Sequence, residues 1–381
     1  MSRNQLKVLH VMPSLSRAFG GPTQSWVGYA RAAKTSGMAV SVAAPAVNEA
    51  DREWLQAQTD AVSYSFFPSA GKGAMVFSPA LHRWLVRHGK AYDAVHVHGL
   101  FNPISSIALR QCVRRNWPVV LRPFGTLSRY TFTHRRTWIK RQYFRRLDGP
   151  SLQKAPAIHF TTRAECDEAA WHGIDFSGRS HVVPPPLAEL PAPSATIADR
   201  DAPIVLFLSR IHPKKNIECL IDAWPRVVAG MPRAELVIAG SGDPDYVEAL
   251  RTRAQTLGVG EISFPGFVAG EKKAGLLAKS SLFVLPSFQE NFGVAVMEAI
   301  GAGLPVVISE QVQLADFVSK NDLGHVIKPE PEALAFSILE ILGSKAYQDH
   351  CSTQGPAAIR QDFSLQQVGK QLVSMYESVR N

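Results

Sequence analysis

Long hydrophobic runs are missing from this sequence of 381 residues, and no stretch of about 18 apolar residues is free of charge, which argues against helical membrane spans. The first residues also have no apolar segment of the kind found in a secretory signal peptide, so we expect a cytoplasmic protein. Charged residues, at 19%, fall below the usual share of about 25%, while hydrophobic residues reach 46%. This composition excludes a disordered chain and favours large folded domains.

Cysteine is rare as well. The chain has four cysteines, Cys112, Cys166, Cys219 and Cys351, which lie far apart in the sequence and form no C-x-x-C or Cys/His pattern. This spacing argues against both a disulfide framework and a zinc site. We therefore expect reduced, buried thiols.

Acidic residues are scarce in the first half of the chain. Residues 1–185 hold 24 Lys and Arg against 10 Asp and Glu, whereas residues 186–381 hold 17 against 22. Basic and aromatic side chains alternate most densely over residues 129–146, a pattern typical of a segment that lies on an anionic membrane. A solvated basic helix is the alternative; nucleic acid is less favoured, and we expect no such partner.

Short apolar, β-branched segments alternate with longer helix-like segments along the whole chain, as in parallel sheets buried under helices on both faces. The predicted strands are residues 7–12, 39–43, 94–97, 118–121, 204–208, 235–239, 262–264, 282–285 and 305–308. The sequence therefore predicts an α/β protein with two doubly wound, Rossmann-like domains.

Three consecutive prolines at residues 184–186 can continue neither a helix nor a central strand, so we place the domain boundary there. The predicted domains are residues 1–185 and residues 186–363. In open α/β sheets, ligands bind outside the carboxyl ends of the strands, so two such sheets facing one another would enclose a cleft. Functional residues are therefore expected in the loops that follow strands.

Two of these loops carry features that suit a phosphate group. Gly20 and Gly21 follow the first predicted strand, and paired glycines let the backbone approach an anion while the next helix points free N–H groups toward it. Arg210 and Lys215 follow strand 204–208, and a guanidinium fork with a compact ammonium suits a diphosphate. An ordinary tight turn and a solvated basic loop are the respective alternatives.

The next post-strand loop contains an Asp-x-Asp pair, Asp243 and Asp245, which superficially suggests metal binding. We favour a structural interpretation in which Gly240 and Gly242 serve the turn. Asp245 would then cap the next helix together with Glu248. No metal ion is expected here.

The most specific segment is residues 286–303, between two predicted strands. A helix that begins near Gly293 would present its N-terminal N–H groups to phosphate. Glu290 and Glu298 are about 12 Å apart if the intervening residues are helical, and each carboxylate can accept hydrogen bonds from sugar hydroxyls. Two surface glutamates are the alternative, weakened by the apolar neighbours of Glu298, among which a carboxylate needs a partner.

In their order and spacing, these motifs resemble glycosyltransferase family 4, whose members are retaining, nucleotide-sugar-dependent enzymes of the GT-B fold. The resemblance spans nearly the whole chain. It implies that residues 1–185 bind the acceptor, that residues 186–363 bind the nucleotide sugar, and that a C-terminal helix at residues 364–381 completes the first domain.

The same resemblance assigns roles to individual residues. Arg210 and Lys215 would act in catalysis by stabilising the donor diphosphate. Glu290, also assigned to the catalytic residues, would bind the hexose, and Glu298 would bind the ribose. Further substrate-binding positions are Gly20, Gly21, Asn291, Phe292, Gly293 and Val294.

One position departs from the family pattern. Many members carry His followed by Asp or Gly after the strand that matches residues 118–121, whereas this chain has Phe124, which can neither exchange a proton nor donate a hydrogen bond. His98, in the same domain, is our candidate catalytic substitute; a loop histidine with satisfied hydrogen bonds is the alternative.

The resemblance implies a retaining, metal-independent hexosyltransferase that needs no cofactor beyond its donor substrate, a nucleoside diphosphate sugar. The acceptor would be a saccharide or a polyprenyl-diphosphate-linked sugar used in polysaccharide biosynthesis, reached from the inner face of the cell membrane. The protein would mainly position the reactants and stabilise charge. A nucleotide-sugar epimerase of the same fold and a non-enzymatic nucleotide-sugar-binding protein are the alternatives.

Overall fold

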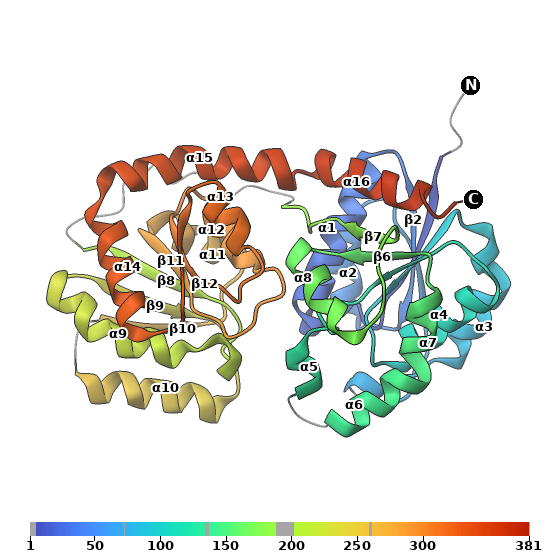
Figure 1. Ribbon diagram of the computed structural model, residues 1–381, viewed down its shortest axis with the longest axis horizontal. Helices are drawn as coiled ribbons and strands as arrows, with labels where there is room; N and C mark the ends of the chain where they lie inside the picture. Colours follow the sequence, from blue (N-terminus) through green and yellow to red (C-terminus); the bar gives the residue numbers. More distant parts are fainter. Residues whose placement is uncertain (1–4, 72, 134–136, 188–201, 259–260, 381) are drawn as a thin grey trace. The chain divides into compact units, whose positions relative to one another are not determined.

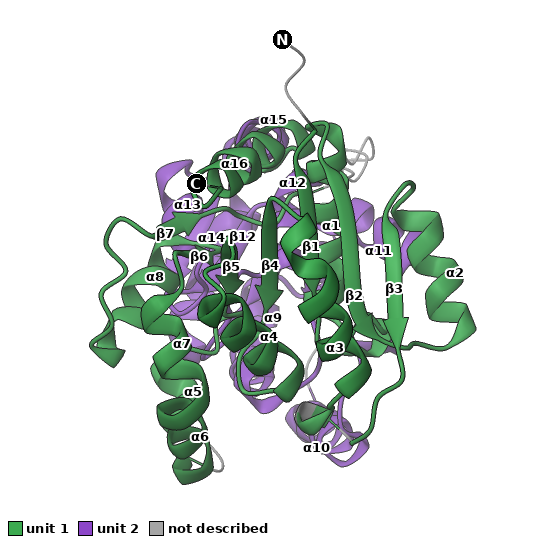
Figure 2. Cartoon of the chain, turned by 90° about the vertical axis from the view of Figure 1, so that its right-hand side faces the viewer, with its two compact units in different colours: residues 1–188, 363–381 green, residues 189–362 purple. Residues whose placement is uncertain are grey.

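The computed structural model describes residues 5–71, 73–133, 137–187, 202–258 and 261–380. The chain divides into two compact units (Figures 1 and 2). The first comprises residues 1–188 together with 363–381, and the second comprises residues 189–362. This division lies close to the proline-rich segment at which the domain boundary was expected.

The first unit contains one parallel sheet of seven strands in the order β3-β2-β1-β4-β5-β6-β7. The order changes direction between β1 and β4, as in a doubly wound fold. Four of the strands correspond to the predicted segments, and β3, β6 and β7 are additional. The strands are β1 (Lys7–Val11), β2 (Ala39–Pro45), β3 (Ser63–Phe67), β4 (Ala94–His98), β5 (Val119–Arg122), β6 (Ala157–Phe160) and β7 (Ser180–Val182).

Helices cover both faces of this sheet (Figure 2). Buried side chains of α1, α2 and α16 form the core on one face, and those of α3, α4, α7 and α8 form it on the other. The helices are α1 (Gly21–Thr35), α2 (Glu49–Gln58), α3 (Pro79–His88), α4 (Pro103–Arg114), α5 (Arg129–Thr133), α6 (Thr137–Tyr143), α7 (Gly149–Lys154), α8 (Arg163–Ala169) and α16 (Leu365–Glu377).

The C-terminal helix α16 belongs to the first unit and lies against α1. A β-carbon at Gly369 would collide with the Ser36 hydroxyl and would lie 2.5 Å from the Ala32 carbonyl oxygen of α1. Glycine at this position therefore allows the two helices to approach closely.

The second unit contains a parallel sheet of six strands in the order β10-β9-β8-β11-β12-β13. Five strands correspond to the predicted segments, and β13 is additional. The strands are β8 (Ile204–Leu208), β9 (Glu235–Ala239), β10 (Glu261–Gly266), β11 (Leu282–Leu285), β12 (Val306–Ser309) and β13 (Gly324–Ile327). The helices are α9 (Ile217–Gly230), α10 (Pro244–Leu257), α11 (Gly270–Lys279), α12 (Val294–Gly301), α13 (Ala315–Lys320), α14 (Pro331–Gly343) and α15 (Lys345–Phe363).

The two parallel-sheet units confirm the predicted α/β fold class. All four cysteines are buried and free, as expected. Across the described parts of the chain, no helix combines the length and the apolar character needed to cross a membrane.

Candidate functional site

The loops that follow β8 and β11 lie side by side in the second unit. The backbone N–H of Phe288 donates to the carbonyl oxygen of Lys214 (2.9 Å) and joins the two loops. Next to this contact, the Lys215 ammonium forms an ion pair with the Glu290 carboxylate, and the side chains are only 5% and 18% exposed. The structure thus brings together two predicted site residues that are 75 positions apart in the sequence.

Lys215 ends a short helical turn, Pro213–Lys215, whose start is capped by the His212 side chain. Burial, followed by the cations of Lys214 and Arg210, lowers the pKa of Lys215. The paired Glu290 carboxylate opposes this shift, because it favours the charged ammonium. A buried cation beside further cations suits an anionic ligand, because each added negative charge relieves repulsion among them.

Arg210 is exposed in the loop that follows β8. Two glycines of the neighbouring loop, after β9, fix its surroundings. Gly240 has φ 152°, and a β-carbon there would collide with the Ser209 carbonyl oxygen; one at Gly242 would collide with the carbonyl oxygen of Ile211. These glycines therefore serve the close approach of the two loops.

Asp243 caps α10. Its carboxylate accepts hydrogen bonds from the backbone N–H groups of Asp245 (3.1 Å) and Tyr246 (3.4 Å). The predicted cap formed by Asp245 and Glu248 is therefore wrong. The helix starts earlier than expected because Pro244, which has no N–H group and a fixed φ, occupies its first position.

The segment between Glu290 and α12 is held by its backbone. Glu290 donates its N–H to the Gln311 carbonyl (3.2 Å) and accepts from the Gln313 N–H (3.2 Å), both in the loop after β12. Gly293 (φ 81°) adopts the left-handed conformation that precedes α12. Between these points, Phe292 is buried, and the buried side-chain oxygen of Asn291 has no hydrogen-bond partner among the described residues.

Glu298 lies in the second turn of α12, directly after the buried residues Val296 and Met297. Its side chain is 17% exposed, and its Oε1 accepts a hydrogen bond from the Lys273 ammonium of α11 at 2.7 Å. The sequence indicated that this carboxylate needs a partner but did not identify Lys273. Nothing in the local pattern marks a lysine 25 residues away as that partner.

In the first unit, Gly20 and Gly21 lie at the start of α1. Gly20 has φ 75° and precedes the helix, which begins at Gly21. A β-carbon added to either residue would have no non-neighbouring heavy atom within 4 Å. The conformation of Gly20 favours glycine, and the space beside both residues is open.

His98 ends β4 and is fully buried. Its Nε2 lies 2.8 Å from Nδ1 of His10, and the Phe124 ring is 5.7 Å away. The Nε2 of His98 is thus engaged, as expected for a histidine with satisfied hydrogen bonds. Its Nδ1, in contrast, is buried and has no partner among the described residues.

His98 belongs to a buried layer of histidines with His10, His96 and His159. The carbonyl oxygen of Val183 can only accept, so the Nε2 of His159, 2.6 Å away, carries a proton. The other nitrogen of His159 then accepts from His96 (3.3 Å), which leaves the Nδ1 of His96 to accept from the Tyr376 hydroxyl (2.8 Å). Burial lowers the pKa of all four histidines.

Three of these residues, His10, His96 and His98, offer ring nitrogens within 4.8 Å of one another, the separation that a metal site requires. The positive charge of the Arg122 guanidinium further lowers the pKa values of all three histidines. A metal cation would be repelled by the same charge. We therefore interpret the cluster as a neutral hydrogen-bonded layer of the core.

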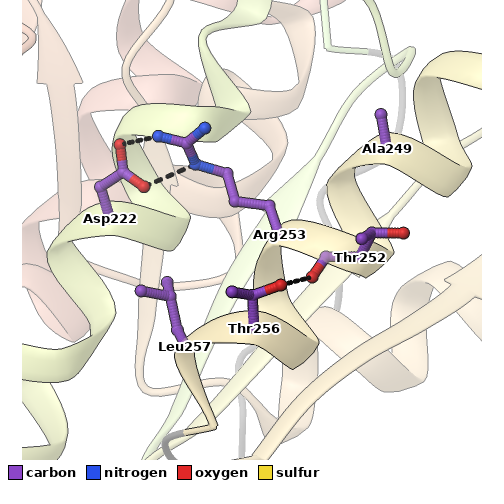
Figure 3. A pocket seen from close by; sticks show the side chains of 6 residues that line it. All are labelled: Asp222, Ala249, Thr252, Arg253, Thr256 and Leu257. Atoms are coloured by element: carbon purple, nitrogen blue, oxygen red, sulfur yellow. Dashed lines mark hydrogen bonds and ion pairs between the residues drawn. The ribbon is translucent and has the colours of Figure 1, made fainter.

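A shallow hollow of about 440 Å³ lies between α9 and α10 (Figure 3). Asp222 and Arg253 face each other there through two hydrogen bonds of 2.6 Å, and Thr256 donates to the Thr252 carbonyl. Since these groups satisfy one another, the hollow offers a ligand little polar recognition.

The two units match two related family models. Residues 20–186 match the model of the Glycosyl transferase 4-like domain, and residues 202–344 match that of Glycosyl transferases group 1, so together they span most of the chain. The chain belongs to the group 1 glycosyltransferases. The resemblance seen in the sequence is thereby confirmed at the level of the family.

Group 1 relatives match this chain over different lengths. A phosphatidyl-myo-inositol mannosyltransferase of Mycobacterium leprae is 27% identical over 94% of this chain and 93% of its own length. An uncharacterized glycosyltransferase of Methanocaldococcus jannaschii is 32% identical over 46% of this chain, and the mannosyltransferase of Mycobacterium tuberculosis is 31% identical over 47%. The matched parts cover only 45% and 48% of these two relatives.

Solved structures share the fold of this chain. Anabaena HepE in complex with UDP and glucose aligns with a TM-score of 0.75 at 19% identity, covering 98% of this chain and 100% of HepE. Sucrose-phosphate synthase from Thermosynechococcus elongatus aligns with a TM-score of 0.75 at 18% identity, covering 98% of each chain. These similarities show the GT-B fold.

Proposed function

We propose that this protein is a retaining, metal-independent hexosyltransferase that uses a nucleoside diphosphate sugar. The observation that carries the proposal is the buried ion pair between Lys215 and Glu290, contributed by the loops after β8 and β11. It joins a cation for the diphosphate to a carboxylate for the hexose hydroxyls. The mannosyltransferase relatives and the UDP and glucose bound to HepE support a donor of this class.

In the proposed reaction, the acceptor oxygen bonds to the anomeric carbon on the face from which the diphosphate leaves. The bond between that carbon and the phosphate oxygen breaks, and the leaving phosphate takes the acceptor's proton. Lys215 and Arg210 would stabilise the charge that develops on the diphosphate. Asn291, Phe292 and the start of α12 would line the donor.

On the acceptor side, residues 1–185 are proposed to bind a saccharide or a polyprenyl-diphosphate-linked sugar, and Gly20 and Gly21 are proposed as substrate-binding positions. His98 stays our candidate there because its Nδ1 has no partner among the described residues. Since the ring is buried against His10 and Phe124, this role would require Phe124 to move aside.

A donor panel tests the proposed reaction. UDP-, GDP- and ADP-hexoses are incubated with the protein and a saccharide acceptor, and the released nucleoside diphosphate is measured with and without EDTA. We expect one donor to be favoured, with release that depends on acceptor and is insensitive to EDTA. Altered sugar without release would favour an epimerase, binding without turnover would favour a sugar-nucleotide-binding protein, and loss of release with EDTA would refute metal independence.

The basic and aromatic segment at residues 129–146 supports a peripheral position on the inner face of the cell membrane. Trp138 and Ile139 of α6 are 70% and 55% exposed, and the neighbouring Arg141 and Arg145 are exposed as well. Not every aromatic side chain of the segment faces outward: Phe132 is buried, with its ring 5.4 Å from that of Phe144. Arg135 and Arg136, counted in the predicted segment, lie outside the described residues.

Flotation with vesicles of phosphatidylglycerol and phosphatidylcholine tests this surface. We expect wild-type protein to float at low salt and to be released at high salt, because the basic charges are screened. Trp138→Glu with Ile139→Glu should abolish flotation, whereas Phe336→Glu, at a 68% exposed aromatic residue of α14, should not. Equal flotation of all three proteins would contradict the proposed surface.

A further inference from the structure

Both glutamates of the proposed donor site are paired with a lysine from another element. Glu290 pairs with Lys215, and Glu298 on α12 pairs with Lys273 in the first turn of α11. The second pair has no role in the proposed reaction so far. It is well defined, with a distance of 2.7 Å between Nζ and Oε1, and with side chains 33% and 17% exposed.

The contact engages only one of the two carboxylate oxygens of Glu298. Lys273 donates to Oε1, and no described residue donates to Oε2. A carboxylate can accept up to about four hydrogen bonds, so acceptor sites remain for hydroxyl groups. The lysine also limits the orientations of the carboxylate and balances its charge on a largely buried helix, in which Val296 and Met297 are 0% and 1% exposed.

We propose that Lys273 is a positioning residue that fixes the Glu298 carboxylate for the ribose of the donor nucleotide. The inference rests on the proposed function, in which Glu298 binds that ribose. By holding Oε1, Lys273 presents Oε2 to the ribose diol, so that ribose is selected over 2′-deoxyribose. A Glu298 carboxylate that is free to rotate would lose part of this selectivity, because the lysine holds the carboxylate in the orientation that binds the ribose.

Nucleotide binding tests this inference without knowledge of the acceptor. The dissociation constants of UDP, GDP and their 2′-deoxy counterparts are measured by calorimetry for the wild type, Lys273→Gln, Lys273→Arg and Glu298→Gln. For the nucleotide that binds the wild type most tightly, we expect Lys273→Gln to weaken binding about tenfold, the scale of one hydrogen bond to a charged group. Binding of the 2′-deoxy form should change much less.

The ratio of the dissociation constant of the 2′-deoxynucleotide to that of the ribonucleotide separates positioning from a merely structural role. A general loss of stability would weaken both forms equally, whereas loss of positioning lowers the ratio. Lys273→Arg should restore most of the ratio, and Lys272→Gln, at the exposed neighbour on α11, should leave it unchanged.

Failure of the inference is distinguishable from failure of the proposed function. If Glu298→Gln lowers the ratio and Lys273→Gln does not, Glu298 binds ribose without help and the inference is overturned. Tighter binding in Lys273→Gln would show that the lysine competes with the ribose, which also overturns it. If Glu298→Gln has no effect, or if no nucleotide binds the wild type, the proposed donor site itself is wrong.

Discussion

The side chain of Lys215 shows how burial can prepare a residue for an anion. It is 5% exposed and lies near Lys214 and Arg210, and burial and these cations lower its pKa. Glu290 is the one carboxylate with which the structure pairs it among the described residues. A diphosphate would bring the negative charge that this group of cations lacks.

At this scale we predict the cost of removing single cations. Arg210→Ala and Lys215→Ala should each lower turnover about a hundredfold or more, as expected on removal of one preorganised charge-stabilising donor. Lys214→Ala should cost less than either, because it leaves Arg210 and Lys215 in place and keeps the backbone carbonyl that accepts from the Phe288 N–H. The measurement is nucleoside diphosphate release with the favoured donor; wild-type turnover in Arg210→Ala would exclude that residue from the proposed role.

At the scale of elements, α16 shows that sequence distance does not decide which unit a helix joins. The helix follows the whole second unit in the chain but belongs to the first. Its buried face includes Val368, Leu372 and Tyr376, and the Tyr376 hydroxyl reaches His96 of β4. Apolar burial and this hydrogen bond therefore fix α16 to the first unit.

A substitution at the contact between α16 and α1 tests this attachment. Gly369→Ala should destabilise the protein by about 1–3 kcal/mol, because the new methyl group would collide with Ser36 and the Ala32 carbonyl. Gly343→Ala, with nothing within 4 Å of the added carbon, should be neutral or stabilising by up to about 1 kcal/mol. Urea unfolding gives both values, and equal midpoints for the two variants would contradict the close packing.

At the scale of the whole molecule, buried histidines distinguish the first unit. Burial lowers the pKa of His10 to about 3 and of His82 to about 4, and lowers those of His96, His98 and His159 well below 6.5. The unfolded chain therefore binds protons that the folded unit cannot bind. Stability that is present above about pH 6.5 is lost as the pH falls below it.

Acid should thus unfold the first unit before the second. The loss approaches about 1.4 kcal/mol per pH unit for each buried histidine. The carboxyl groups of Asp148 and Glu165, whose pKa values burial raises, oppose this loss of stability, but they are fewer than the buried histidines. Fluorescence of a Trp224→Phe variant, which keeps the tryptophans of the first unit alone, should report unfolding between pH 6.5 and 4. Unchanged urea midpoints over that range would contradict the prediction.

Much of the fold follows from the sequence because buried parallel strands produce uninterrupted apolar segments. The predicted bounds of β8, β9 and β11 agree with the structure. Three of the missed strands lack that pattern: β3 is exposed or half-exposed throughout, β7 has three residues, and β13 is half-buried. The fourth, β6, is buried throughout, but a histidine interrupts the apolar character of its four residues. The site loops could be predicted for the same reason, since functional residues follow the strands that are easiest to find.

The sequence by itself determined the strand pattern, the family and the residues to consider in each loop, because these depend on local order along the chain. Only the tertiary structure decided the partners: Lys273 for Glu298, and His10 for His98. Such pairs depend on which strands and helices become neighbours and on the direction in which each side chain leaves its element. That information arises from the packing of the whole sheet, so no local pattern contains it.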